Sequence, residues 1–510
     1  MSFLKKLASD SAIYGLNSIL GRGVNFLLVG LHSLVFFPEE ISVTILLFSY
    51  ATFFNIIYSY GMETTFFRFA SKDKTNFQKT YNLAQSSLLI SSIVLSAIII
   101  LFSNNISSWI EHPADGHLVV WFAFILALDA LVAIPFARLR LENKAKKYVS
   151  IRLAAVFINV FLNIFFLLFC RKIFNGEIFP DLKPLISIIY SPTLGVGYII
   201  LANLIGNLIY IPALWSELVT KFSFYFEKSE FLKMWRYGYP LLILGLAGMV
   251  NQQIDRQMLS SFLPLDFYPG LNHENNDAII GIYGTCYKLS ILISLATQSF
   301  RFAADPFFFS KAEDKNAPAV FAEVTKWFTI FCCLLWVVIC LNLDVLSELF
   351  IRKEVYKTGL GIVPLLLLGN LLLGIYFNLA VWFKLTDKTI FGTYITLFGA
   401  VLNIVLNYIL IPKIGYMGCA WAFMISSLAM AILCYWLGNR HFPVPYNLKS
   451  IVGYIVGSAL LIYLNSFINI SNVWLSIGFH GLVFILFLGI VIIVEREKIL
   501  PKRWRVYFGK

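Results

Sequence analysis

The chain has 510 residues, of which 59% are hydrophobic and only 13% are charged, and its mean hydropathy is +0.77. Soluble domains carry about 25% charged residues, so the composition excludes a soluble globular protein and indicates a chain that is buried in a bilayer. The seven cysteines stand in apolar runs without CxxC spacing. This pattern excludes a zinc site or a disulfide framework as the organising feature.

A membrane-spanning helix needs about 20 mostly apolar residues. Lys5 and Lys6 precede the first such run. That run is long enough to span and has no small-residue cleavage site, so we expect a first transmembrane helix and not a removed signal peptide. The sequence predicts an all-α integral membrane protein with about fourteen transmembrane helices: Ser11–Phe36, Ser42–Phe66, Leu83–Ser103, His117–Ala137, Val149–Cys170, Tyr190–Leu214, Tyr237–Phe262, Ile279–Phe300, Val320–Leu341, Leu360–Val381, Thr389–Ile411, Ile414–Trp436, Ser450–Phe467 and Val473–Val494.

The distribution of Lys and Arg predicts the orientation of these helices. If the N-terminus is cytoplasmic, the inner segments hold 30 of the 40 Lys and Arg residues and the outer loops hold 7. Because cytoplasmic loops are enriched in Lys and Arg, we expect both termini to be cytoplasmic. This bias also accounts for most of the net charge of +12, and a nucleic-acid partner is not needed to explain it.

Three short motifs recur in the same order about 220–240 residues apart, at equivalent helices. These are Phe67–Ala70 with Phe300–Ala303, Leu162–Ile164 with Leu402–Ile404, and Pro192–Gly197 with Pro412–Gly418. The recurrence predicts two pseudo-symmetric six-helix bundles, with the substrate site between them near the bilayer midplane. We expect lobes at residues 1–220 and 221–440, followed at 441–510 by two additional helices and a basic cytoplasmic tail.

Three cations lie deep inside predicted spans, away from the span ends, where a charge is costly and usually faces a cavity or a partner. They are Arg22 in the first span, Arg256 in the seventh and Lys288 in the eighth. An Arg fork matches phosphate oxygens bidentately, and Lys acts as a point charge. We therefore expect a cationic cavity for an anionic head group, although an ion-pair network around Asp255 stays an open alternative. Polar residues accompany the cations at helical spacing: Asn17, Asn25, Asn251 and Gln252.

The intramembrane acids are Glu63, Asp129 and Asp255. A carboxylate at the depth of Asp129 can bind a proton or Na⁺, or it can neutralise Arg22, so these three acids are candidates for ion coupling or for charge pairing. Charges near the cytoplasmic helix ends are candidates for an inner gate or for simple interface charges: Arg68, Arg301 and Asp305. The sequence lacks Walker A, HExxH and GxSxG motifs, which argues against an ATP-driven pump and common hydrolases. It indicates neither a cofactor nor a metal.

Several stretches together resemble the bacterial polysaccharide-export flippases of the Wzx type, which belong to the MOP superfamily with the MATE exporters and the lipid II flippases. The resemblance covers residues 1–440 approximately and rests on these segments: Lys6–Arg22, Tyr60–Thr64, Phe67–Phe69, Ile134–Arg138, Phe300–Pro306 and Leu402–Ala420. It implies two six-helix bundles, a cationic central cavity and alternating access. It also implies that Arg22, Arg256 and Lys288 contact the pyrophosphate of the substrate.

The resemblance implies a transporter, not an enzyme, that flips a polyprenyl-pyrophosphate-linked oligosaccharide from the cytoplasmic to the outer leaflet of the bacterial inner membrane. Its expected partners are the bilayer, this lipid-linked oligosaccharide and the polysaccharide polymerase machinery. Three alternatives stay open. They are a MATE-like cation or drug antiporter, a lipid II flippase, whose branch matches the helix count better, and a membrane glycan polymerase or ligase, which would need a larger outer loop.

Overall fold

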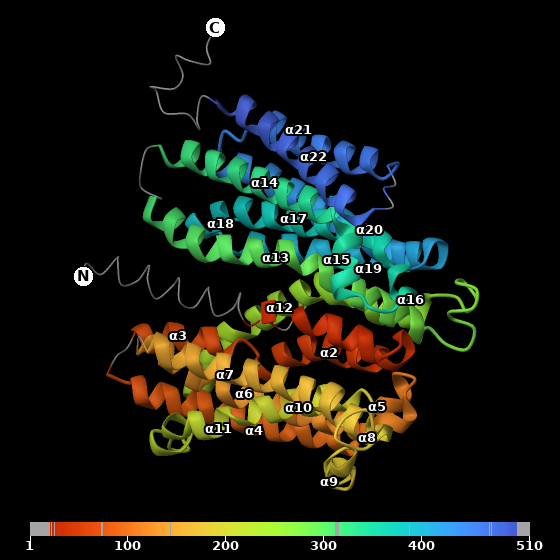
Figure 1. The fold of residues 1–510 in the computed structure, drawn as a ribbon. Helices are drawn as coiled ribbons and strands as arrows, with labels where there is room; N and C mark the ends of the chain where they lie inside the picture. Colours follow the sequence, from red (N-terminus) through yellow and green to blue (C-terminus); the bar gives the residue numbers. More distant parts are fainter. Residues whose placement is uncertain are drawn as a thin grey trace.

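The computed structural model describes residues 21, 23–24, 26–72, 75–142, 144–311, 316–386, 388–468, 470 and 472–496. All regular elements in these ranges are helices, and they form two bundles with two further helices at the C-terminal side. Figure 1 shows the red-to-yellow helices packed together on one side and the green-to-blue helices on the other, with α12 at their boundary. This confirms the predicted fold class.

The first bundle contains ten helical segments, several of them short: α2 (Pro38–Ser59), α3 (Met62–Lys72), α4 (Phe77–Leu101), α5 (Ser103–Trp109), α6 (Gly116–Leu141), α7 (Ala145–Ile164), α8 (Arg171–Phe174), α9 (Lys183–Ile189), α10 (Gly197–Leu208) and α11 (Tyr210–Ala213). Residues 26–35 form a shorter apolar helix before them. The second bundle contains α12 (Lys228–Phe262), α13 (Asp277–Lys311), α14 (Ala317–Leu341), α15 (Leu343–Phe350), α16 (Glu354–Lys357), α17 (Val363–Leu379), α18 (Val381–Leu385), α19 (Ile390–Ile414) and α20 (Tyr416–His441). The additional helices are α21 (Leu448–Asn465) and α22 (Val473–Val494).

In the described part of the chain, eleven helical segments are long and apolar enough to cross a membrane. The other three predicted spans correspond to two shorter apolar helices, Phe26–Val35 and Gly197–Ala213, and to α12, which is long but polar. The count of fourteen therefore stays a prediction.

Several predicted spans differ from the helices that form; for example, α12 begins nine residues before the predicted Tyr237 and α13 ends eleven residues after the predicted Phe300. Two further differences have a local cause. The second predicted span is interrupted because Tyr60 and Gly61 both have positive φ, of 31° and 73°. A Cβ at Gly61 would lie 2.8 Å from the carbonyl oxygen of Gly238, so this break brings the first bundle against the backbone of α12. The sixth predicted span begins at Gly197 instead of Tyr190, because a 3-10 turn at Pro192–Leu194 precedes it.

The two bundles are closed against each other at one face, which we call the outer face in keeping with the expected orientation. An added Cβ at Gly281 of α13 would lie 2.1 Å from the carbonyl oxygen of Pro38, the first residue of α2. Beside this contact His112 Nε2 lies 3.1 Å from Asp277 Oδ1 and 3.4 Å from Ser42 Oγ. Backbone packing and a polar clasp therefore join the bundles here.

The additional helices are attached to the second bundle by a buried charge pair. Lys326 of α14 lies 2.5 Å from Glu495, directly after α22, and both side chains are almost fully buried. The hydroxyl of Tyr454 on α21 donates to the same carboxylate at 3.2 Å. Most of the remaining surface of α21 and α22 is apolar and exposed, as expected for helices that face lipid.

Candidate functional site: a cavity between the bundles

A cavity of about 480 Å³ lies between the two bundles. It is bordered by residues 26–32 and by α2, α7, α10, α12, α13 and α17. The polar side chains among its lining residues are His32, Thr52, Asn159, Asn163, Asn203, Gln252, Gln253, Tyr287, Lys288, Ser290, Ser294 and Asn370. Amides and hydroxyls therefore dominate its chemistry.

Lys288 is the cation among the described lining residues, and no Asp or Glu is found among them. It stands about 16 Å along α13 from Asp277 at 1.5 Å per residue, which is about halfway through a hydrocarbon core of about 30 Å. No salt bridge joins Lys288 to a carboxylate in the described ranges. A partly buried ammonium without such a partner favours an anion in the cavity.

Opposite Lys288, the first bundle contributes hydrogen-bonding groups. His32 Nε2 lies 2.9 Å from Asn163 Oδ1, and Asn163 Nδ2 donates to the carbonyl oxygen of Asn159 at 2.9 Å. The spacing of four residues places both asparagines on one face of α7. This side of the cavity can accept or donate hydrogen bonds but carries no fixed charge among the described residues.

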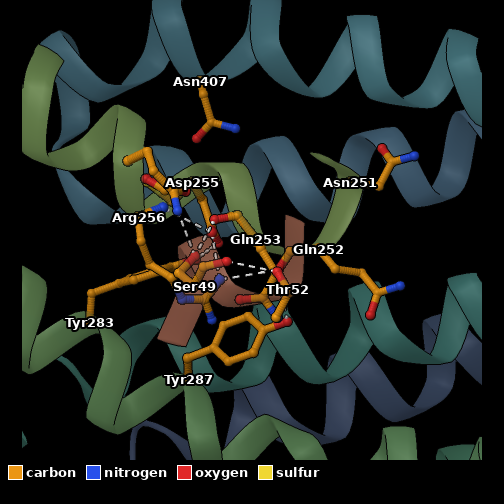
Figure 2. A network of polar contacts seen from close by, with 12 residues as sticks. Ser49, Thr52, Asn251, Gln252, Gln253, Asp255, Arg256, Tyr283, Tyr287 and Asn407 are labelled. Atoms are coloured by element: carbon orange, nitrogen blue, oxygen red, sulfur yellow. Dashed lines mark hydrogen bonds and ion pairs between the residues drawn. The ribbon is translucent and has the colours of Figure 1, made fainter. Parts of the chain in front are cut away.

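Arg256 lies behind the cavity wall and is paired, as Figure 2 shows. Its Nη1 lies 2.6 Å from Asp255 Oδ1 and donates to the carbonyl oxygen of Gln252 at 3.1 Å. The guanidinium carbon also lies 3.9 Å from the centre of the Tyr287 ring, and Tyr283 donates a short hydrogen bond to Asp255. Only 5% of Arg256 is exposed, so it supports Tyr287, which lines the cavity, and does not line the cavity itself.

Polar contacts from Ser49 fix α2 against α12 (Figure 2). Its hydroxyl donates to the carbonyl oxygen of Gln253 at 3.1 Å and accepts from Gln257 Nε2 at 2.8 Å. Thr52 Oγ1 donates to the carbonyl oxygen of Ser49 at 2.7 Å. The two bundles are thus joined at the wall of the cavity as well as at the outer face.

Asn251 faces the second bundle, away from the Arg256 pair (Figure 2). Its side-chain Nδ2 donates to the backbone carbonyl oxygen of Thr396 at 3.2 Å. The backbone carbonyl oxygen of Asn251 accepts from Asn403 Nδ2 at 3.1 Å. Asn407 continues the series by donating to the carbonyl oxygen of Asn403 at 2.9 Å. These buried amides connect α12 with α19.

Asp129 lies in the first bundle, away from the residues that line the cavity. Its Oδ1 accepts from Asn207 Nδ2 at 3.4 Å, and its charge acts on the nearby guanidinium of Arg152. Arg152 stacks on Phe136 at 4.2 Å and donates to the Tyr210 hydroxyl at 3.4 Å. A cation partner for Asp129 is therefore Arg152, and not Arg22, which the sequence had suggested as a possible partner.

The residues expected at the cytoplasmic ends make separate contacts. Glu63 is half exposed and pairs with Arg140 at 2.8 Å. The two arginines of the repeated motif stack in the same way, Arg68 on Tyr237 at 4.1 Å and Arg301 on Phe377 at 4.0 Å from the ring centres. Asn17, Arg22, Asn25 and the side chain of Asp305 lie outside the described residues.

The site assignment from the sequence stays a prediction, and the structure groups its members differently. Lys288 and Gln252 line the cavity, whereas Arg256 and Asp255 form a pair behind it and Asn251 belongs to the amide series. Most of the lining residues were not predicted from the sequence. The sequence did contain a pattern that could have indicated them: Tyr287, Ser290, Ile291 and Ser294 follow one another at spacings of three, one and three residues and therefore lie on one face of α13.

Solved structures of a lipid II flippase and of a MATE family transporter have a similar arrangement of helices. Residues 281–409 match the MatE family model. An inward closed conformation of the lipid II flippase MurJ has a TM-score of 0.72 at 14% identity, covering 95% of this chain and 99% of that chain. An inward-facing conformation of a multidrug resistance MATE family transporter of the MOP superfamily has a TM-score of 0.62 at 13% identity, covering 86% and 95%.

The chain therefore has the fold that the lipid II flippase MurJ shares with MATE family transporters, and it is a multi-pass membrane protein. A sequence relative is an uncharacterized membrane protein of Methanocaldococcus jannaschii. It is 22% identical over 434 residues, which cover 84% of this chain and 96% of that protein.

Proposed function

We propose that this chain is a flippase, not an enzyme, and that it moves a polyprenyl-pyrophosphate-linked oligosaccharide from the cytoplasmic to the outer leaflet of a bacterial inner membrane. The carrier works by alternating access between its two bundles. Both of its termini are cytoplasmic, and the polymerase that consumes the flipped glycan is its functional partner. The Wzx-like motifs in the sequence support this assignment of the substrate class.

The observation that carries the proposal is the chemistry of the central cavity. Lys288 supplies a positive charge at mid-depth, and the described lining residues include amides and hydroxyls but no carboxylate. A phosphate matches the ammonium, and the hydroxyl groups of a glycan match Asn159, Asn163 and Gln252 as hydrogen-bonding partners. A cation antiporter would favour acidic lining residues, so the cavity supports an anionic substrate better.

The membrane potential favours this direction of transport. A negative head group that moves outward from an electrically negative cytoplasm gains about 2.3 kcal/mol per charge per 100 mV. The empty carrier then returns with the positive Lys288, and the same field drives that charge inward. Transport can therefore proceed on the potential alone, with Asp129 or Asp255 as candidates for ion coupling.

The test is deletion of the gene, followed by complementation with wild type, Lys288→Ala or Lys288→Arg at matched protein level. We expect the deletion to accumulate lipid-linked glycan in the inner leaflet and to lose surface glycan. Lys288→Ala should fail to restore export, and Lys288→Arg should restore part of it because the charge is kept. Normal surface glycan in the deletion strain would contradict the proposed function.

A lipid II flippase is the second candidate, because the similarity to MurJ extends over 95% of this chain. The two candidates differ in the glycan that is carried, and both substrates are phosphate-linked lipids. Expression of this chain in cells depleted of their lipid II flippase separates them. Restored growth would support lipid II as the substrate, and continued lysis together with loss of another surface glycan in the deletion strain would support the oligosaccharide.

A further inference from the structure

A second cavity of about 700 Å³ lies on the other side of α12, within the second bundle. It is bordered by α12, α13, α17, α18, α19 and α20. Met249 and Gln252 line both this cavity and the central one, so the two spaces meet along α12. We refer to it as the second cavity.

The second cavity has a cationic mouth. Arg236, Arg301 and Lys384 line it near the helix ends that are expected to be cytoplasmic, and its described lining residues include no Asp or Glu. Arg301 rests with its face on Phe377 at 4.0 Å. A guanidinium held by its face keeps its N–H donors in its own plane, where they match phosphate oxygens.

The mouth opens to the surface between the beginnings of α12 and α19. Pro240 and Ile390 line the second cavity and are also exposed. Deeper inside, the lining is mostly apolar: the buried Leu373, Tyr376 and Met430 lie there, together with the polar side chains of Asn251 and Thr396. The cavity thus passes from a cationic rim to an apolar interior as it runs toward the bilayer midplane.

This polarity is that of a lipid in the inner leaflet, whose phosphate lies at the interface and whose hydrocarbon chain points to the midplane. We propose that the second cavity binds the polyprenyl diphosphate part of the substrate before transfer, with the diphosphate at Arg236, Arg301 and Lys384 and the isoprenoid chain in the apolar interior. The head group then passes to Lys288 along Gln252, which faces both cavities. This inference rests on the proposed function and adds a capture site to it.

Gly248 offers a way to fill the second cavity without disturbing its walls. It lines only this cavity of the two, and an added Cβ would meet no atom within 4 Å. Gly248→Phe therefore places a ring in the space for the isoprenoid chain, and it replaces a poor helix former. Gly453 on α21 is a matched control, because an added Cβ there also meets no atom within 4 Å and it lines neither cavity.

The experiment measures binding of farnesyl diphosphate to the purified full chain in nanodiscs of zwitterionic lipid. We expect Gly248→Phe and the pair Arg236→Gln with Arg301→Gln to weaken binding about tenfold or more, as loss of a charge-assisted contact or of apolar burial does. Gly453→Phe should bind as the wild type does. Inorganic diphosphate, farnesol and phosphatidylglycerol should each bind at least about tenfold more weakly than farnesyl diphosphate.

Unchanged binding by Gly248→Phe would overturn the capture site, and so would equal binding of inorganic diphosphate or of phosphatidylglycerol, which would indicate a simple anion site or a bilayer lipid. Lys288→Ala separates this inference from the proposed function. If Lys288→Ala binds farnesyl diphosphate normally but fails to export glycan, the capture site and the proposed function are both supported. If deletion of the gene leaves export normal while Gly248→Phe still loses binding, the proposed function fails and the lipid site remains.

Discussion

Two cations near Tyr287, Arg256 against its ring and Lys288 next to it in the sequence, differ in their surroundings although the sequence places them at similar depth. Arg256 is paired with Asp255 at 2.6 Å and covered by the Tyr287 ring. Lys288 lines the central cavity and has no salt bridge within the described ranges. The depth of a charge in the membrane therefore shows that it is costly to bury. Its neighbouring side chains determine whether it stabilises the fold through an ion pair or can bind a ligand.

The first prediction separates these two roles by stability. Arg256→Met should lower the free energy of unfolding by about 3–5 kcal/mol, because it leaves the carboxylate of Asp255 buried without its partner. Lys288→Met should leave stability unchanged or raise it, since it removes a partly buried charge that has no salt-bridge partner among the described residues. Thermal unfolding in detergent measures both. The double variant Asp255→Leu with Arg256→Met is the control and should lose less stability than Arg256→Met alone, because it leaves no buried carboxylate without a partner. Equal losses of unfolding free energy for Arg256→Met and Lys288→Met would contradict the distinction between a structural and a ligand-binding cation.

The second prediction extends the comparison to another paired cation. Lys326→Met should destabilise the attachment of α21 and α22, because Glu495 loses its ion-pair partner at 2.5 Å. Each orphaned carboxylate keeps one tyrosine donor, Tyr454 for Glu495 and Tyr283 for Asp255. The loss should still be smaller than that of Arg256→Met, because Glu495 stands at the end of α22, where water is closer than it is to Asp255 inside α12. Hydrogen exchange should show faster exchange confined to α21 and α22. Unchanged exchange there would mean that packing alone holds these helices.

The third prediction concerns the clasp at the outer face. Burial by itself would lower the pKa of His112, but the hydrogen bond and charge of Asp277, with Asp115 and Glu111, raise the pKa above 6.5. The contribution of the clasp to stability should therefore be complete below pH 6.5 and should disappear as the pH rises through the raised pKa. The difference in unfolding free energy between wild type and His112→Gln should be larger at pH 6 than at pH 9. A difference that grows with pH would contradict the clasp.

The fourth prediction concerns an exposed ion pair, for which we expect the smallest effect on stability. Glu63 and Arg140 are 2.8 Å apart, but both side chains are more than 40% exposed. Glu63→Gln should change the free energy of unfolding by at most about 1 kcal/mol, because water and salt screen such a pair. Thermal unfolding at low and high salt tests this. A loss as large as that of Arg256→Met would mean that Glu63 acts beyond this pair.

The fold was largely predictable because long apolar runs with few charges have one stable form in a bilayer, as α4, α14 and α20 show. The interruptions were less predictable. The break at Tyr60 and Gly61 depends on the approach of Gly238 from a distant helix, and no local pattern reports that contact.

The site was predictable only in part, for a similar reason. The intramembrane position of Lys288 marked it as a candidate. The pairing of Arg256, in contrast, depends on its side-chain conformation and on the packing of α12 against α13, which place Asp255 and the Tyr287 ring next to the guanidinium. Asn163 entered the sequence analysis as part of a repeat, and the structure places it beside His32 in the cavity. Spacing shows which residues share a helix face, whereas packing determines which face meets the cavity.

The central claim is that Lys288 carries the anionic head group across the membrane. The most direct measurement is the rate at which a fluorescent polyprenyl-diphosphate oligosaccharide changes leaflets in liposomes that contain the purified chain, followed with an impermeant quencher. We predict rapid movement with the wild type and none above empty liposomes with Lys288→Ala, at equal reconstitution and equal thermal stability. Movement at the wild-type rate with Lys288→Ala would contradict the account.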